Sequence, residues 1–149
     1  MYIRVDENGV QRGIGEPKMK SIRRRILVVD DSAAIRDMMA TTLAEEGFEV
    51  EGAVDGADAL GRLASTTYDA VLSDLQMPGM DGFSLLREIR RREIGVPVII
   101  QSARVDALLE TILCRAGAFR VLSKGGVVEL LQALGEAIGS SKPSPAGCG

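Results

Sequence analysis

The 149-residue chain contains no histidine, and this absence excludes several kinds of site. Without an imidazole the chain can hold no Ser-His-Asp triad, no histidine-ligated metal and no phosphohistidine. Aromatic residues make up only 3% of the sequence, so aliphatic side chains have to fill the core. The same scarcity argues against the aromatic platforms that bind single-stranded nucleic acid, and we expect no nucleic-acid partner.

Cysteines and long apolar runs are also scarce. Cys114 and Cys148 lie far apart and match no metal-binding spacing, so a reduced, cytoplasmic setting is the simplest inference. Cys114 falls in a helical stretch, where we expect a small buried apolar residue. No stretch approaches the roughly 20 apolar residues of a membrane span, and no signal peptide opens the chain. Membrane insertion is therefore not expected.

The two ends differ in composition from the middle. The first 25 residues carry seven Lys and Arg against three Asp and Glu, whereas the remainder carries eleven against eighteen. We expect residues 1–24 to form a basic extension, either a small hairpin around Asn8-Gly9 or a disordered segment. Residues 25–139 are expected to form the folded domain, and residues 140–149 a flexible tail.

Strand and helix signals alternate five times between these ends. Short, continuous apolar runs predict buried strands at 26–29, 70–72, 97–100 and 118–122, and a more alternating run predicts a strand nearer an edge at 48–53. Apolar residues at helical spacing predict helices at 33–46, 57–64, 82–92, 106–116 and 127–138. This alternation predicts an α/β domain with a five-stranded parallel sheet, doubly wound as (βα)5.

The loop at 73–82 is the most distinctive segment. It begins with Asp74, which follows a buried strand and therefore lies at the edge where ligands bind in open α/β sheets. Pro78-Gly79 predicts a turn, because proline fixes one backbone angle and glycine accepts the positive one that follows. Asp81 is placed to cap the next helix.

Further polar residues follow the other strands of the predicted sheet. Asp30 and Asp31 follow the first strand, Ser102 ends the fourth and Lys124 follows the fifth. Together with Asp74 these side chains meet at one edge, where three carboxylates repel one another unless a divalent cation is bound. Mg²⁺ suits such a site, because it takes a few carboxylates and completes its shell with water and phosphate oxygens. The set suits phosphoryl transfer, with Asp74 as nucleophile and Ser102 and Lys124 holding phosphoryl oxygens.

Four segments make the sequence resemble the response regulator receiver domains of two-component signalling, over residues 25 to about 139. They are VVDDS at 28–32, SDLQMPGMDG at 73–82, PVIIQSA at 97–103 and the run from Gly117-Ala118 to Lys124. The resemblance implies the flavodoxin-like strand order 2-1-3-4-5. It also implies that Asp74 accepts a phosphoryl group from a histidine kinase or phosphotransfer protein. Asp30, Asp31, Asp74 and the main-chain carbonyl of Gln76 are then implied to hold Mg²⁺.

The resemblance also implies signalling to a downstream protein through the face of the fourth helix, fifth strand and fifth helix, with a homodimer left open. Two departures bear on this route. Gly125-Gly126 follows the lysine, where the family usually has proline, and Val121 stands where the family usually has an aromatic residue. Eleven residues follow Ile138, so we expect a stand-alone receiver without a DNA-binding output domain, although a domain cut from a longer protein would look similar.

Two alternatives stay open beside this interpretation. A degenerate receiver would keep the fold as a binding module without phosphorylation. An aspartate-nucleophile phosphohydrolase would use the same acyl phosphate on small substrates, but such enzymes have a second acid two residues after the nucleophile, where this chain has Gln76. We therefore expect no enzyme activity beyond phosphorylation and dephosphorylation of Asp74 itself.

Overall fold

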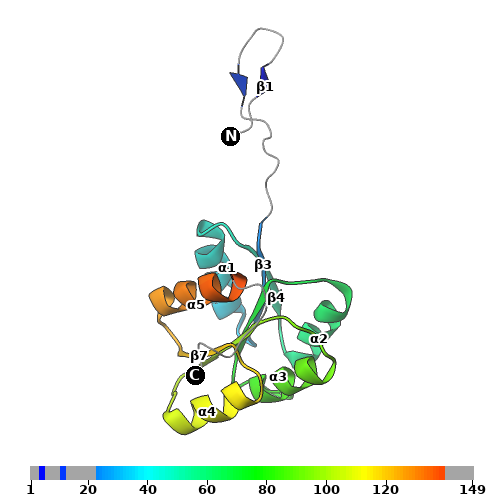
Figure 1. Cartoon of the computed structure of the whole chain (residues 1–149), viewed down its shortest axis with the longest axis vertical. Helices are drawn as coiled ribbons and strands as arrows, with labels where there is room; N and C mark the ends of the chain where they lie inside the picture. Colours follow the sequence, from blue (N-terminus) through cyan, green and yellow to red (C-terminus); the bar gives the residue numbers. More distant parts are fainter. Residues whose placement is uncertain (1–3, 6–10, 13–22, 140–149) are drawn as a thin grey trace.

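The computed structural model describes residues 4–5, 11–12 and 23–139. Residues 23–139 form a five-stranded parallel sheet with helices on both faces (Figure 1). The strand order is β4-β3-β5-β6-β7, which is 2-1-3-4-5 when these strands are counted along the chain, and the predicted doubly wound fold is confirmed. The strands are β3 (Arg25–Val29), β4 (Glu49–Ala53), β5 (Ala70–Asp74), β6 (Val98–Ser102) and β7 (Arg120–Ser123).

Each strand of the five-stranded sheet is followed by a helix, which makes every connection within this sheet a crossover. Ser32, Asp81 and Asp106 each cap a helix by accepting a hydrogen bond from the backbone N–H three residues later. Gly47 follows α1 with a φ of 93°, a left-handed conformation that glycine adopts without steric cost. The helices are α1 (Ala33–Glu45), α2 (Gly56–Ser65), α3 (Gly82–Arg91), α4 (Ala107–Arg115) and α5 (Val127–Gly139).

The N-terminal extension contributes two short strands to the described residues. β1 (Arg4–Val5) pairs antiparallel with β2 (Gln11–Arg12). The expectations for the rest of residues 1–22, for the tail at 140–149 and for Cys148 lie outside the residues that the structure describes.

The sheet separates two apolar clusters. Side chains alternate along β3, so Leu27 and Val29 pack on one face with α2, α3 and α4, while Ile26 and Val28 pack on the other face with α1 and α5. Figure 1 shows the same division, with α1 and α5 together on one side of the sheet. Both clusters are mainly aliphatic, as the scarcity of aromatics predicts.

The last strand begins later than predicted. The apolar run at 118–122 predicts a start at residue 118, whereas β7 begins at Arg120. The N–H of Ala118 donates to the carbonyl of Leu113, at 3.0 Å, and so completes the turn that ends α4. Gly117 supplies the positive φ, of 111°, that this helix end requires.

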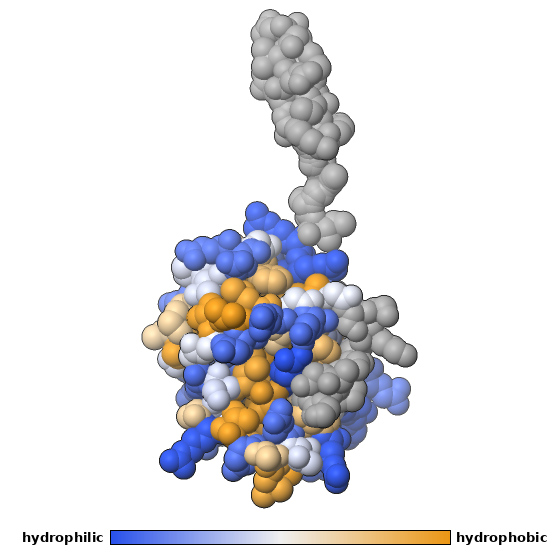
Figure 2. Space-filling model, turned by 60° about the vertical axis from the view of Figure 1, so that its left-hand side comes forward, coloured by the Kyte–Doolittle hydropathy of each residue, from blue (hydrophilic) through white to orange (hydrophobic). Residues whose placement is uncertain are grey.

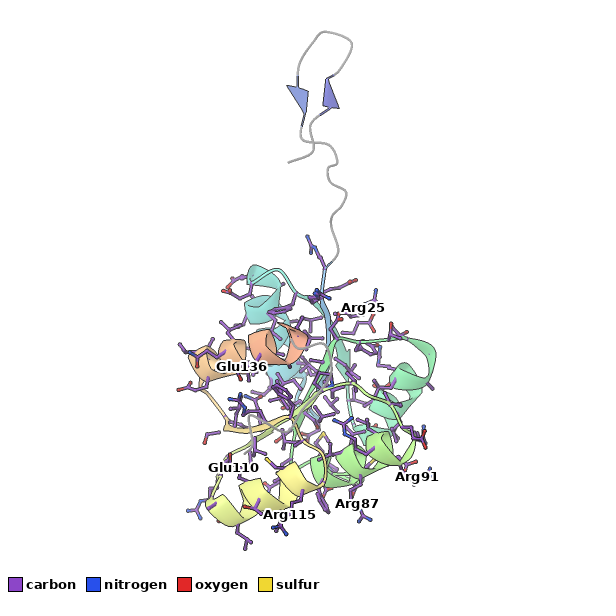
Figure 3. All side chains as sticks on the ribbon, in the orientation of Figure 1. Arg25, Arg87, Arg91, Glu110, Arg115 and Glu136 are labelled. Carbon is purple, nitrogen blue, oxygen red and sulfur yellow. The ribbon has the colours of Figure 1, made fainter. Side chains whose placement is uncertain are left out.

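The three arginines at the end of α3 do not act alike, although the sequence gives no reason to separate them. Arg91 and Arg92 are exposed and pair with Glu88, and their hydrogen bonds lower the pKa of Glu88 to about 2. Figure 3 shows Arg91 and the neighbouring Arg87 on the outer surface of α3. Arg90 instead folds inward, where burial lowers the pKa of its guanidinium.

The guanidinium of Arg90 joins two loops. It donates to the carbonyl of Gly117 from Nε and Nη2, at 3.2 and 2.9 Å, and from Nη1 to the carbonyls of Ile94 and Val96, both at 2.9 Å. A Cβ at position 117 would lie 2.8 Å from Arg90 Nε, so glycine there leaves room for the side chain. Arg90 thus holds the segment before β6 against the segment before β7.

Two further sequence expectations concern α4 and the membrane. Cys114 packs against the cluster formed with α2, α3 and α4, but it is half-buried rather than buried. Throughout the part of the chain that the structure describes, every helix is too short or too polar to cross a bilayer.

Candidate functional site

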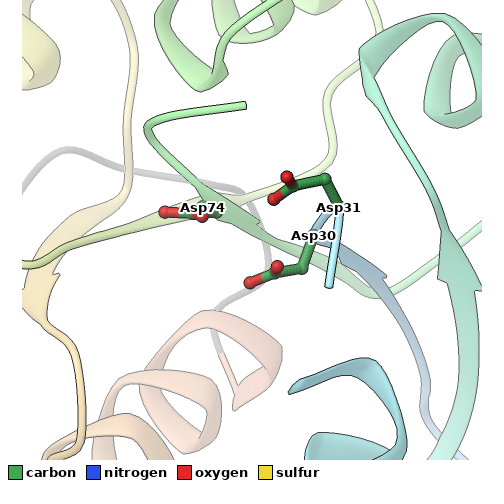
Figure 4. A group of neighbouring side chains, drawn as sticks. All are labelled: Asp30, Asp31 and Asp74. Atoms are coloured by element: carbon green, nitrogen blue, oxygen red, sulfur yellow. The ribbon is translucent and has the colours of Figure 1, made fainter. Parts of the chain in front are cut away.

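Three carboxylates gather at the carboxyl edge of the sheet. β3 and β5 are adjacent and parallel, so Asp30, just after β3, and Asp74, the last residue of β5, lie at the same edge. Asp30, Asp31 and Asp74 each offer an oxygen within 4.8 Å of the others. Figure 4 shows the three carboxylates side by side, with their oxygens on the same side of the cluster. The sequence-predicted acidic cluster is therefore assembled.

The backbone around Asp30 fixes its carboxylate. The N–H of Ser32 donates to Asp30 Oδ1 at 2.9 Å, and the N–H of Asp30 donates to the carbonyl of Ala53 in the neighbouring strand at 3.2 Å. Burial raises the pKa of the Asp30 carboxyl above its ordinary value, and the carboxylates of Asp74 and Asp31 act in the same direction. The hydrogen bond from Ser32 opposes this shift. A positive ion between these groups would favour their ionised forms.

Sequence reasoning missed Arg36 as part of this region. Its Nη1 donates to the carbonyl oxygen of Asp30 at 2.6 Å, which ties α1 to the end of β3. The side chain passes over Gly52 of β4, where a Cβ would lie 3.1 Å from Arg36 Cδ. The available signal was the glycine, because glycine within a strand often marks the close approach of another group.

Lys124 is the only lysine between residues 21 and 141, and its side chain lies at the acidic cluster. Its Nζ lies 3.0 Å from Asp74 Oδ2, and 39% of its side chain remains exposed. The N–H of Lys124 donates to the carbonyl of Ser102 at 3.0 Å, so the end of β7 is tied to the end of β6 beside the acidic cluster. The structure thus brings Lys124 to Asp74, as expected from the strand ends.

Ser102 is buried at the end of β6, the strand next to Asp74. Its hydroxyl donates to the carbonyl of Arg104 at 2.9 Å, and the N–H of Arg104 lies 3.4 Å from the same oxygen. The sequence placed Ser102 at this edge of the sheet but could not show that its hydroxyl is bonded within its own loop.

The loop after β5 is held close to the strand. The N–H of Gly82 donates to the carbonyl of Leu75 at 2.8 Å, and a Cβ at position 82 would lie 2.5 Å from the carbonyl oxygen of Asp74. Gly79 has a φ of 75°, as expected for the predicted Pro78-Gly79 turn. Gln76 lies in this loop with its side chain exposed.

The donor set fits a hard divalent cation. Three carboxylates offer anionic oxygen ligands, and one of them, from Asp31, is exposed and leaves the site open to solvent. Mg²⁺ prefers such oxygen ligands and retains several waters. Thiolate or imidazole ligands, which softer metals favour, are absent from the described residues of this cluster.

A doubly wound sheet with an acidic cluster and a lysine at its carboxyl edge defines a class of α/β domains suited to handling phosphate with a divalent cation. The sequence model of the response regulator receiver domain matches residues 26–135. The chain belongs to this family, and its fold and acidic cluster are those of a receiver domain of two-component systems. Receiver domains are regulatory rather than enzymes in the ordinary sense.

Full-length regulators are among the relatives. NtrC of Escherichia coli K12 is 41% identical over 99 residues, which are 66% of this chain and 21% of NtrC. The DNA-binding response regulator MtrA of Mycobacterium tuberculosis H37Rv is 37% identical over 100 residues, 67% of this chain and 43% of MtrA. The chain thus spans about a fifth of NtrC and less than half of MtrA.

Solved receiver structures match nearly their whole length. The receiver domain of Francisella response regulator 1452 has a TM-score of 0.75 and 30% identity, covering 78% of this chain and 98% of that one. TrrA of Thermotoga maritima, solved in complex with Mg²⁺-BeF, has a TM-score of 0.69 and 32% identity, covering 76% and 98%.

Proposed function

We propose that this protein is a phosphoacceptor response regulator and that Asp74 takes a phosphoryl group from a histidine kinase or phosphotransfer protein. The observation that carries the proposal is the position of Asp74, between the acidic pair of Asp30 and Asp31 and the ammonium of Lys124, 3.0 Å from its Oδ2. A carboxylate held between a cation site and a lysine has both of its phosphoryl-binding neighbours in place before the donor arrives.

The metal ligands are assigned to the same edge. Asp30, Asp31, Asp74 and the main-chain carbonyl of Gln76 would hold Mg²⁺ in this assignment. The bound ion would neutralise the carboxylates and the oxygens of an incoming phosphoryl group. Two observations support this ligand assignment: the acidic cluster itself, and the likeness to TrrA, which was solved with Mg²⁺-BeF.

The chain's own residues divide the transfer step between them. An Asp74 oxygen attacks phosphorus, and the bond from phosphorus to the donor breaks as the new bond forms, with its electron pair leaving on the donor. Lys124 pairs with the phosphoryl oxygens in place of Asp74 Oδ2, because its ammonium already lies at this carboxylate. Ser102 donates its hydroxyl to the phosphoryl group after releasing the carbonyl of Arg104.

The output is proposed to be a change in protein binding rather than catalysis. The downstream partner would contact the face of α4, β7 and α5, and the cytoplasm is the expected compartment. Leu108 and Ile112 on α4 and Val128 on α5 are exposed apolar residues on this face. A homodimer through the same face is the second assembly to be tested.

Acetyl phosphate with Mg²⁺, followed by borohydride trapping and mass spectrometry, tests the assignment. We expect the label on Asp74, and loss of labelling in Asp74→Asn. The matched control is Asp37→Asn, which removes an exposed carboxylate of α1 away from the cluster. Unlabelled wild-type protein would favour the degenerate receiver, and equal labelling of Asp74→Asn would place the acceptor elsewhere.

Metal binding is tested without any phosphoryl donor. Mn²⁺, a paramagnetic substitute for Mg²⁺, should broaden amide NMR signals around residues 30–32 and 74–76, and Mg²⁺ should reverse the effect by competition. Asp31→Asn should weaken this competition at least tenfold, because it removes one of three anionic ligands. Unchanged competition in Asp31→Asn, with Asp37→Asn as the control, would contradict the ligand assignment.

A further inference from the structure

A cavity opens on the side of the sheet covered by α1 and α5. Its volume is about 400 Å³, within the 300–1,000 Å³ range typical of small-molecule sites. Ile35, Met38 and Met39 of α1 and Val127 and Leu130 of α5 form apolar walls. Figure 2, which turns the side of α1, α4 and α5 toward the viewer, shows hydrophobic side chains gathered at the level of α1 and α5 and again over α4.

Gln101 lies at the base of this cavity. Along β6, Val98 and Ile100 pack with the cluster under α2, α3 and α4, while Ile99 packs with the cluster under α1 and α5. Because side chains alternate along a strand, Gln101 points to the same side as Ile99 and lines the cavity. Sequence reasoning treated Gln101 only as part of a strand end and assigned it no role.

The side-chain amide of Gln101 lines the cavity without a hydrogen-bond partner among the described residues. The residue as a whole is only 6% exposed, and among the described residues its side-chain amide takes part in no hydrogen bond. Its backbone carbonyl, by contrast, accepts from the N–H of Leu75 at 2.9 Å. Among the described residues, the one fully buried side-chain polar atom without a partner is Arg120 Nε, so the amide of Gln101 is accessible from the cavity rather than sealed in the core. The cavity therefore presents a donor and an acceptor to whatever occupies it.

The charge of the cavity limits the ligand further. Lys124 lines its mouth, but the ammonium is paired with Asp74 at 3.0 Å. No other charged side chain lines the cavity, and its one further side-chain hydrogen-bonding group is the hydroxyl of Thr42. An uncharged ligand matches this lining, because a charged one would lose its hydration without gaining an ion pair.

We propose that the cavity between α1 and α5 binds a small, uncharged, largely apolar molecule whose amide or carbonyl group pairs with the side-chain amide of Gln101. The site lies beside the acidic cluster but is separate from it, and the proposal does not depend on phosphorylation of Asp74. It assigns to this receiver a ligand site in addition to the acidic edge.

N-butylbenzamide is a suitable probe, since it combines two apolar groups with one amide. Titrated into the ¹⁵N-labelled full chain, it should give saturable shifts in the side-chain NH₂ of Gln101 and in backbone amides of α1 and α5 around the cavity. Gln101→Met keeps the side-chain length and removes the amide, and it should weaken binding at least tenfold. Gln132→Met removes the same group from the exposed surface of α5 and should leave the affinity unchanged.

A second pair of variants protects the test against misfolding of Gln101→Met. Thr42→Leu adds volume inside the cavity and should abolish the saturable shifts, whereas Thr41→Leu, at the exposed neighbouring position, should not. Circular dichroism before each titration shows which variants fold. Absence of saturable shifts in the wild type, or equal affinity in Gln101→Met and wild type, would overturn the proposal. So would a concentration-dependent dimer that covers the same residues and excludes the probe, because a second copy would then be the occupant.

Discussion

The hydroxyl of Ser102 donates to the carbonyl oxygen of Arg104 at 2.9 Å, and the N–H of Arg104 lies 3.4 Å from the same hydroxyl oxygen. This pairing closes the first turn of the loop that leads from β6 to α4. Ser102 cannot donate its one hydroxyl proton to Arg104 and to a phosphoryl group at the same time. Phosphorylation that engages Ser102 must therefore release this loop.

The first prediction locates the response to phosphorylation. Beryllofluoride, an acyl phosphate mimic, should shift backbone amide signals most in residues 102–116 and only modestly around Val121. Val121 is buried and β-branched, so it has neither the size nor the rotamer freedom to signal by turning. Gly125, with a φ of 94°, and Gly126 add conformational freedom at the other side of the site.

The new hydrogen bonds to the phosphoryl group together approach the free energy that this rearrangement needs. Charge-assisted hydrogen bonds from Ser102 and Lys124 contribute about 1.5–3 kcal/mol each, and about 5.5 kcal/mol moves a two-state equilibrium from rare to dominant. Ser102→Ala is the matching control, and it should reduce the shifts in residues 102–106. Shifts centred on β7 with little change in α4 would contradict this account.

A second prediction concerns the close approach of Gly82 to the β5 strand. A Cβ at this position would lie 2.5 Å from the carbonyl oxygen of Asp74 and 2.9 Å from Leu75 Cα, both backbone atoms that cannot turn aside. Gly82→Ala should therefore lower the free energy of unfolding by about 1–3 kcal/mol. It should also reduce labelling by acetyl phosphate, because the backbone of Asp74 must move.

The control for Gly82 is Gly61, within α2. A Cβ at position 61 would meet nothing within 4 Å, so Gly61→Ala should raise the free energy of unfolding by about 0.5–1 kcal/mol. Urea denaturation measures both variants. Equal stability of Gly82→Ala and the wild type would show that the loop relaxes without cost.

How far the sequence could predict this molecule depends on the range of the interaction involved. The strand order needed the family resemblance, but the convergence of Asp74 with Asp30 and Lys124 followed from apolar runs and parallel strand ends alone. The inward turn of Arg90 and the hydroxyl bond of Ser102 could not be predicted, because they depend on side-chain directions set by distant segments. Local pattern fixes where a residue lies along an element, whereas its hydrogen-bond partner is decided by packing.

The third prediction tests the loop-joining role of Arg90. Arg90→Met should lower the free energy of unfolding by about 3 kcal/mol, because the carbonyls of Gly117, Ile94 and Val96 lose a charged donor. Arg91→Met, at an exposed position paired with Glu88, should change stability by less than about 1 kcal/mol. Urea denaturation of the two variants separates a buried clamp from a surface ion pair, and equal losses would contradict the assignment.

The fourth prediction concerns the apolar surface of α4. Leu113 of α4 and Leu130 of α5 are buried and belong to the core. Leu108 is 69% exposed and Ile112 44%, so these two residues carry the surface. Leu108→Glu and Ile112→Glu should leave the fold intact and abolish self-association or partner binding through this face.

Sedimentation velocity with and without beryllofluoride measures self-association of the wild type and of these variants. Val54→Glu places the same charge on an exposed apolar position beside β4, at the opposite edge of the sheet, and should change nothing. If the wild type associates and Leu108→Glu associates equally well, α4 is not the contact surface.

The last prediction concerns the lifetime of the phosphorylated state. Gln76 and Arg104 lie two residues beyond Asp74 and Ser102, and both side chains are exposed beside the acidic edge. Long polar side chains at these positions can orient an attacking water or obstruct it, so removing them should change hydrolysis more than phosphorylation. Gln76→Ala and Arg104→Ala are compared with Arg87→Ala, an exposed arginine on α3 outside this edge. The decay of trapped label after removal of acetyl phosphate gives the rate, and unchanged decay in both variants would place control of hydrolysis elsewhere.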